Sequence, residues 1–161
     1  MAMNEMVMKQ LVRDESLQQV YQNVTNLVVD KYIKAHMQIP YGFEHVHRVA
    51  DQAQTSGQYF VGLLHDIVED DLATWDEVHK TDITRYEYDA LKLLCRKKEG
   101  QTYREYINEL ANSGNTLAII VKIHDLRDHL RVDAVNTYSE SHIKRYTDAL
   151  FVLLAALRKE R

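Results

Sequence analysis

Hydrophobic positions along the chain recur at intervals of three and four residues, which is the spacing of one face of an α-helix. The segment from Met3 to His36 shows this pattern, with a polar break at residues 14–16. The strict alternation typical of strands does not occur, and the chain holds only one Pro and five Gly. The sequence therefore predicts an all-α fold. The apolar face expected in the first segment comprises Leu17, Val20, Val24, Leu27, Val28, Tyr32 and Ala35.

The remaining helices are predicted from their boundary signals. Pro and Gly favour a turn at 39–42, because Pro lacks an N–H and Gly tolerates positive φ. A helix is expected from Phe43 to Ser56 with Gly57 as its C-terminal cap, and a further one from Gln58 to Asp71. Thr-x-x-Glu capping boxes at Thr74, Thr84 and Thr102 predict helices over 75–80, 85–97 and 103–112. Two more helices are expected over 117–130 and 141–158.

The length of 161 residues fits one structural domain with a substantial core. We expect residues 1–34 to form an N-terminal helical segment packed on a domain that spans 35–161. The apolar stretch 150–157 is either the central core helix or a dimer surface, so a homodimer stays open as an alternative.

Composition and charge restrict the classes of binding partner that can be expected. The net charge is −4 and no long run of Lys or Arg occurs, so neither a nucleic-acid polymer nor an anionic membrane surface is expected. No stretch approaches the ~20 apolar residues of a membrane span. The single Cys95 excludes an internal disulfide and fits a reducing compartment. We therefore expect a cytoplasmic protein.

Candidate chemistry is concentrated at the end of the predicted helix 58–71. There His65 stands one turn before Glu69, and Asp66 one turn before Asp70, beside an apolar stripe. Three carboxylates at this spacing repel one another, and burying them unpaired is costly. A divalent cation would remove the conflict, since imidazole and carboxylate both bind such ions. The alternative is a solvated acidic helix end.

Two further clusters of histidine and acid favour the cation site over the solvated helix end. His45 and His47 lie about twenty residues upstream of His65, and His124-Asp125 lies near the end of a later helix. Two histidines, an adjacent acid and a distant acid form a mixed nitrogen and oxygen shell that suits Mn, Fe, Zn or another divalent first-row metal. His47 would replace His45 if its helix were rotated. His124-Asp125 is a second adjacent His-Asp pair, but the Glu69-Asp70 extension favours His65-Asp66 as the pair that binds the metal.

The order His45, His65-Asp66, Asp125 resembles the H…HD…D signature of the HD-domain metal-dependent phosphohydrolases. The continuation into Glu69-Asp70 resembles the RelA/SpoT-type (p)ppGpp hydrolase branch. Segments 90–97, 102–107 and 121–126 are similar to successive helices of that branch, and the likeness covers residues 35 to 155.

This resemblance implies a single HD-domain helical bundle in which His45, His65, Asp66 and Asp125 bind one divalent metal ion. Mn is expected first, with Zn, Fe, Ni, Co or Mg as alternatives. Glu69 and Asp70 would position or deprotonate the attacking water. Candidate substrate-binding residues are Lys122, His129 and Arg131; for Lys122, Arg127 and Arg131 the alternative is that they balance acids on a solvated helix.

The implied substrate is a small phosphorylated, nucleotide-like molecule. (p)ppGpp 3′-pyrophosphohydrolase activity is the most specific version, and a nucleoside-monophosphate phosphatase or a nucleotide pyrophosphatase is the rival. A non-catalytic metal-binding regulatory module is an alternative from another class. Oxygen chemistry at an iron centre would need further ligands that the sequence does not place.

The chain departs from the branch at three places. Segment 35–41 is short and lacks the Arg and Lys of a longer basic loop, His129 stands where Asn is usual, and Cys95 stands where Thr is common. The metal and Glu-Asp positions are intact. Metal-assisted hydrolysis is therefore expected, with the identity of the substrate open.

Overall fold

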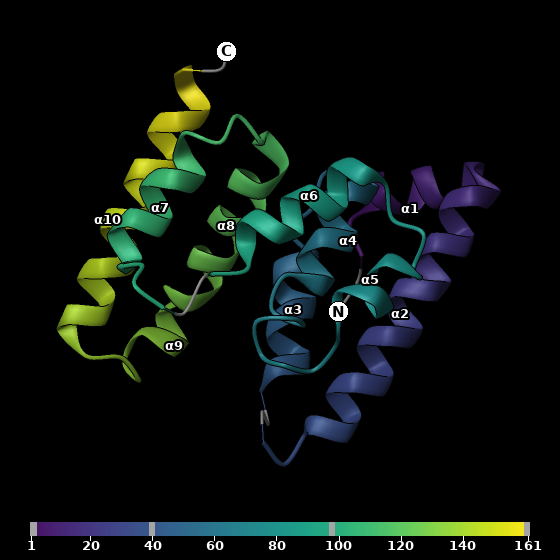
Figure 1. The fold of residues 1–161 in the computed structure, drawn as a ribbon, viewed down its shortest axis with the longest axis horizontal. Coiled ribbons are helices and arrows are strands. Elements are labelled where there is room, and N and C mark those ends of the chain that lie inside the picture. The colour runs from purple at the N-terminus through teal and green to yellow at the C-terminus, as the bar shows by residue number, and fades with distance from the viewer. Residues whose placement is uncertain (1–2, 39–40, 97–98, 160–161) are drawn as a thin grey trace.

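The computed structural model describes residues 3–38, 41–96 and 99–159. Within these residues the chain forms ten helices and no strand (Figure 1), so the all-α prediction is confirmed. The helices are α1 (Glu5–Arg13), α2 (Glu15–Ala35), α3 (Gly42–Ala50), α4 (Ser56–Leu64), α5 (Trp75–His79), α6 (Arg85–Leu94), α7 (Tyr103–Ala111), α8 (Thr116–His129), α9 (Val132–Val135) and α10 (Glu140–Lys159).

The N-terminal segment is two helices with a break, as predicted. Asp14 has an extended backbone, and its carboxylate accepts the backbone N–H groups of Ser16 and Leu17, which caps α2. Helix α2 packs on α3 and α4, and α1 packs on α2 and α4. Val24, Val28 and Tyr32 form the buried face of α2.

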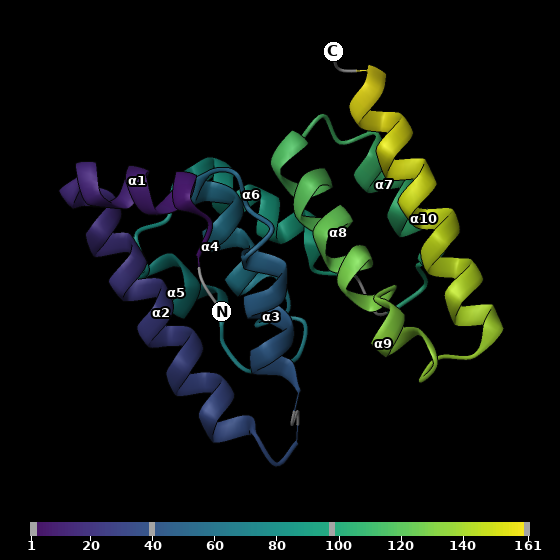
Figure 2. The same ribbon diagram turned by 180° about the vertical axis from the view of Figure 1, so that it is seen from behind.

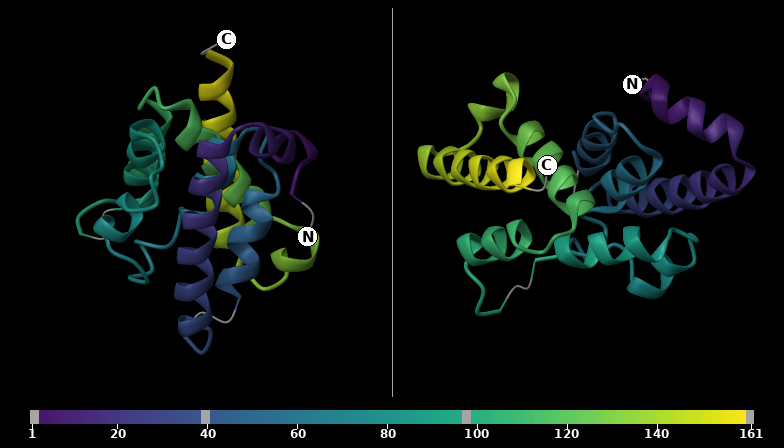
Figure 3. Two further views of the ribbon diagram at one scale, coloured as in Figure 1. Left: turned by 90° about the vertical axis from the view of Figure 1, so that its right-hand side faces the viewer. Right: turned by 90° about the horizontal axis from the view of Figure 1, so that it is seen from above.

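Helix α8 lies at the centre of the molecule. It contacts α3, α4 and α6 on one side and α7 and α10 on the other, an arrangement visible from the front and from above (Figures 1 and 3). Nine of its fourteen residues are buried, among them Asp125 and Asp128. Helix α10 packs through Ala149 and Leu153, while Phe151 is 68% exposed. The central helix is thus α8 rather than α10.

The three predicted capping boxes are confirmed. At Thr74, Thr84 and Thr102 the hydroxyl accepts a backbone N–H, and the Glu three residues later accepts the backbone N–H of the Thr. These reciprocal bonds satisfy two donors at each helix start and are set by four neighbouring residues. The short α9 was not predicted.

Three predicted helix ends were wrong. The helix expected to run to Ser56 ends at Ala50, and the Thr55 hydroxyl then accepts the N–H of Gln58 and caps α4. Gly57 therefore lies in the first turn of α4 instead of capping the preceding helix. The helix predicted over 85–97 ends at Leu94, because the Cys95 backbone is extended; Lys97 lies outside the described residues, as do Ile39 and Pro40 of the turn predicted at 39–42.

The helix predicted over 58–71 ends at Leu64, and residues 65–71 form successive turns. The Asp70 N–H still donates to the Asp66 carbonyl at 2.9 Å, but Asp71 takes a left-handed φ of 58°. Acidic side chains are unfavourable at a helix C-terminus, where the helix dipole is negative. The regular helix therefore stops before the acidic residues begin.

A close crossing of α3 and α4 places the next elements. A Cβ at Gly62 would lie 3.0 Å from the Cα of Ala50, which is closer than ordinary van der Waals contact. Glycine lets the two backbones approach to this distance. Viewed from behind, α3 runs beside α8 (Figure 2). The histidines of α3 and of the end of α4 therefore face the acids of α8.

Candidate metal centre

Two imidazoles meet between α3 and the end of α4. His45 donates from Nδ1 to the Asp128 carboxylate at 2.7 Å, and His65 donates from Nδ1 to the Gly62 carbonyl at 2.8 Å. An oxygen partner at Nδ1 fixes the tautomer and leaves Nε2 as the lone-pair atom of a neutral ring. The two Nε2 atoms lie 3.3 Å apart. When both rings are neutral in these tautomers, the lone pair of His45 Nε2 faces the lone pair of His65 Nε2, which is repulsive.

Two carboxylates flank this imidazole pair. Asp66 Oδ2 lies 3.5 Å from His45 Nε2 and 3.2 Å from His65 Nε2. Asp125 Oδ1 lies 3.2 and 3.7 Å from the same two nitrogens. His65 and Asp125 are buried. The structure thus brings together all four residues that the sequence proposed as metal ligands, from α3, the turn after α4, and α8.

The electrostatics of the cluster favour a positive charge at its centre. Burial lowers the pKa of the His45 imidazole, but the hydrogen bond to Asp128 and the neighbouring carboxylates of Asp125 and Asp66 outweigh it and raise that pKa to about 12. Burial raises the pKa of the Asp125 carboxyl, but the Lys122 ammonium and the imidazoles hold it well below its usual range. The cluster therefore attracts either protons or a cation.

The residues present fit a divalent metal ion. Asp125 Oδ1 is buried and accepts no hydrogen bond from any residue that the structure describes, despite the nearby ring nitrogens. Ligand atoms about 2.1 Å from one ion lie about 3.0 to 3.4 Å apart at octahedral or tetrahedral angles. The observed separations of 3.2–3.7 Å are slightly wider. This set of imidazole and carboxylate donors, with one unsatisfied buried oxygen, could hold a cation.

Asp128 is a residue that the sequence reasoning missed. Its buried carboxylate accepts the Nδ1–H of His45 and also pairs with Arg48 at 2.7 Å and Arg131 at 2.6 Å. These partners lower the pKa of the carboxyl against the opposing effect of burial. A carboxylate behind a metal-binding imidazole orients the ring and raises its basicity. The only sequence signal was its position one turn after Asp125, next to the last residue of α8.

A polar cavity of about 230 Å³ opens beside the cluster. Asp66 and Asp125 line it, together with Glu69 and Asp70, the two proposed catalytic acids. Glu69 Oε2 accepts the backbone N–H of Arg96 at 3.0 Å. The remaining lining residues are the cations Arg96, Lys122 and Arg145, the aromatic residues Tyr103, Tyr106 and Tyr146, and Leu126 and His129.

A larger hollow of about 540 Å³ between α7 and α10 shares Tyr103 and Arg145 but contains none of the four ligand candidates.

The three candidate substrate-binding residues have different positions. Lys122 donates to Asp125 Oδ2 at 2.7 Å, which leaves Oδ1 facing the histidines. His129 stands beside Asp125, its Nε2 3.1 Å from Oδ1. Arg131 pairs with Asp128 and Asp133 and is not among the residues lining the cavity. Lys122 and His129 therefore reach the cavity, whereas Arg131 acts behind His45.

The alternative histidines lie elsewhere. His47 donates from Nδ1 to the Phe43 carbonyl at 2.8 Å, and its ring packs against that of Phe43. His124 is buried, and burial together with the charge of Arg127 lowers its pKa to about 4. Neither belongs to the groups of described His, Cys, Asp and Glu residues whose donor atoms are close enough to hold an ion.

No family model matches the chain, and no curated protein is significantly similar to it. Among the described residues, none of the helices has the length and apolar character needed to cross a membrane.

Proposed function

We propose that the chain is a metal-dependent phosphohydrolase of the HD type, closest to the RelA/SpoT-type (p)ppGpp hydrolases. His45, His65, Asp66 and Asp125 would hold one divalent ion, with Mn as the first candidate and Zn, Fe, Ni, Co or Mg as alternatives. The observation that carries the proposal is the adjacency of two features. A cluster of imidazoles and carboxylates, of which His65 and Asp125 are buried, opens into a cavity lined by three cationic side chains.

The charges of the cavity favour an anionic substrate once a cation is bound. Four carboxylates and three cationic side chains line it, which leaves a net negative charge with neutral histidines. A divalent ion reverses that sign. Arg96 and Arg145 can then pair with phosphate oxygens, for which the planar guanidinium group is well suited. A phosphorylated substrate is therefore expected to need the metal for binding as well as for reaction.

Each nearby side chain has a definite task in hydrolysis. A bound divalent ion supplies Lewis acidity and lowers the pKa of water from 15.7 towards about 7. The Glu69 carboxylate, oriented by the Arg96 N–H, and the Asp70 carboxylate line the same cavity; one would accept the proton of the attacking water and the other would position that water. Lys122 keeps Asp125 ionised and fixes the direction of its carboxylate. Arg96 and Arg145, which line the same cavity, would stabilise the negative charge that develops on the leaving group.

The substrate class is a nucleotide-like phosphoester or pyrophosphoryl compound. The intact Glu69-Asp70 pair favours (p)ppGpp 3′-pyrophosphohydrolase activity, and the short segment 35–41 and His129 favour a nucleoside-monophosphate phosphatase or a nucleotide pyrophosphatase. We further propose a cytoplasmic location, consistent with the single cysteine. No nucleic-acid polymer is expected as partner, and a homodimer stays an alternative.

The proposal is tested by metal analysis of the purified full chain and by phosphate and pyrophosphate release from a nucleotide panel that includes ppGpp, with and without Mn²⁺. About one metal per chain is expected. Pyrophosphate release from ppGpp would identify the alarmone activity, and phosphate release from nucleoside monophosphates the nucleotidase activity. Absence of both metal binding and turnover would overturn the proposal.

Glu69→Gln separates catalysis from metal binding. It should lower turnover by about 10²–10⁴-fold, as loss of a general base does, with the metal content unchanged. Asp71→Asn is the matched control, because Asp71 lies in the same acidic turn but does not line the cavity, and Asn tolerates its left-handed backbone. Metal-loaded Glu69→Gln with full turnover would remove Glu69 from the mechanism.

A further inference from the structure

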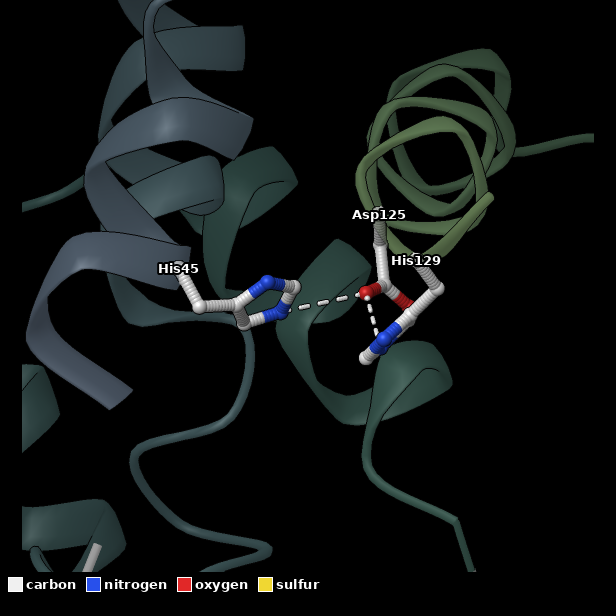
Figure 4. A group of neighbouring side chains, drawn as sticks. All are labelled: His45, Asp125 and His129. Carbon is white, nitrogen blue, oxygen red and sulfur yellow. Dashed lines mark ion pairs between the residues drawn. The ribbon is translucent and has the colours of Figure 1, made fainter. Parts of the chain in front are cut away.

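His129 belongs to the cluster but not to the four proposed ligands. It lies one turn after Asp125 on α8, and its Nε2 is 3.1 Å from Asp125 Oδ1. Figure 4 shows His45 reaching Asp125 from α3, while His129 reaches the same oxygen from α8. His45, Asp125 and His129 offer donor atoms that all lie within 4.8 Å of one another. The group is therefore compact enough to surround an ion.

The three imidazoles share one arrangement. Each Nδ1 contacts an oxygen: Asp128 Oδ2 for His45, the Gly62 carbonyl for His65, and the Tyr138 hydroxyl, at 2.8 Å, for His129. Each Nε2 lies 3.1–3.7 Å from Asp125 Oδ1, which nevertheless accepts no hydrogen bond from the described residues. An oxygen at Nδ1 with Nε2 directed inwards is the usual arrangement of a metal-binding histidine.

The ring of His129 is also held in place by packing. It stacks on Tyr146 with centroids 5.2 Å apart and lies 4.8 Å from the His45 ring. A ring fixed on two sides loses less conformational freedom when Nε2 takes up a ligand. His129 is thus positioned as firmly as the two histidines of the proposed site.

One ion rather than two is expected here. The compact groups are His45–His65–Asp66 and His45–Asp125–His129, and both contain His45. The ring nitrogen facing both groups is Nε2, because Nδ1 is bound to Asp128. A neutral imidazole nitrogen has a single lone pair in the ring plane and cannot serve two ions. The five residues therefore surround a single centre.

We propose that His129 Nε2 is a fifth protein ligand of this ion, an inference that rests on the metal centre of the proposed function. The shell then contains three imidazoles and two carboxylates. Imidazole favours Zn, Fe, Ni and Cu, whereas carboxylate, carbonyl and water suit Mg and Mn. His129 accordingly shifts the metal preference of this chain towards the later first-row ions. A six-coordinate ion would keep one position for water or substrate.

The test uses Co²⁺ and Mn²⁺ alone, titrated into the full chain and into His129→Asn, with calorimetry for affinity and visible absorption for the Co²⁺ ligand field. We expect His129→Asn to weaken Co²⁺ binding by about 10- to 100-fold, to weaken Mn²⁺ binding less, and to change the Co²⁺ spectrum. His36→Asn is the control, since His36 is exposed at the end of α2 and should leave both metals unaffected.

Equal Co²⁺ affinity and an unchanged spectrum in folded His129→Asn would overturn the inference. Tyr138→Phe provides a second variant, because it removes the oxygen at Nδ1 and keeps the imidazole; a smaller loss of Co²⁺ affinity is expected, and no loss counts against the inference. Co²⁺ binding that depends on His129, in a chain that hydrolyses no nucleotide, would overturn the proposed function and leave the fifth ligand standing.

Discussion

The contact between Gly62 and Ala50 links the packing of the helices to the geometry of the candidate metal centre. Gly62→Ala would place a Cβ 3.0 Å from the Ala50 Cα and 3.2 Å from its backbone N. Ordinary contacts begin near 3.4 Å, and neither neighbouring atom belongs to a flexible side chain, so α3 and α4 must separate by some tenths of an ångström. Overpacking of this kind costs about 1–3 kcal/mol. The gain of Ala over Gly within a helix offsets about 0.5–1 kcal/mol of it.

The separation also reaches the candidate ligands. His45 is on α3, His65 follows α4, and the Gly62 carbonyl accepts the His65 Nδ1–H. Metal–ligand distances tolerate changes of only about 0.2 Å. We therefore expect Gly62→Ala to lower the free energy of unfolding by about 1–2 kcal/mol and the metal affinity by about tenfold or more. Urea denaturation of the metal-free chain and metal titration measure the two effects.

Gly57→Ala is the matched control on the same helix. Its Cβ would meet Glu87 Oε1 at 3.0 Å, a side-chain atom that can shift by a small rotation while Oε2 keeps its bond to the Thr84 N–H. Its stability should stay within about 0.5 kcal/mol of the parent, with unchanged metal binding. If Gly62→Ala matched Gly57→Ala in both measurements, the close crossing of α3 and α4 would not control the site.

Three further substitutions test other contacts. Asp128→Asn keeps the shape but removes the charge behind His45, and metal affinity should fall by about 10- to 100-fold in a titration. Glu77→Gln removes an ion pair with Lys31 that, with the Thr74 backbone N–H, lowers the Glu77 pKa from 4.5 to about 2. A lowered carboxyl pKa stabilises the fold above pH 4.5, and this stabilisation is lost as the pH falls to about 2. The Glu77→Gln variant should therefore be less stable than the parent at pH 6, and the difference should shrink on acidification. Denaturation at each pH measures it. Leu153→Ala should cost about 2–5 kcal/mol in urea denaturation, since Leu153 is fully buried between α10 and the rest of the core.

The sequence predicted best those features that four or five adjacent residues decide. The capping boxes at Thr74, Thr84 and Thr102 depend on a hydroxyl and a carboxylate three positions apart, and all three occur. The break at Asp14 is equally local. Helical periodicity then sufficed for the all-α class, because no competing alternation is present in the chain.

Helix ends that depend on contacts between elements were predicted poorly. The apolar pattern of α4 continues through Ile67, which is buried, although the regular helix stops at Leu64. The spacing of apolar residues indicates which side chains are buried, not where a helix ends. The turns after Leu64 bury Ile67 without helical geometry. In the same way, Gly57 matches a C-terminal cap until Thr55 is seen to cap the helix that follows.

The site shows the same division between local and distant information. His65, Asp66, Glu69 and Asp70 lie within six residues and could be proposed together from their spacing. Asp128 could not, because its meaning depends on His45, 83 residues away on another helix.

The position of His129 required the structure for a related reason. The sequence offered it as a substrate contact, since nothing in its neighbourhood shows where Nε2 points. In the folded chain, the α8 turn that presents Asp125 Oδ1 presents His129 Nε2 beside it, and Tyr138 and Tyr146 hold that ring. One helical turn of α8 thus supplies an acid, a third imidazole and, through Asp128, the orientation of His45. A substitution that rotates α8 would therefore disturb the contacts of all three at once, whereas a change in α3 would act through His45 and through Arg48, which pairs with Asp128.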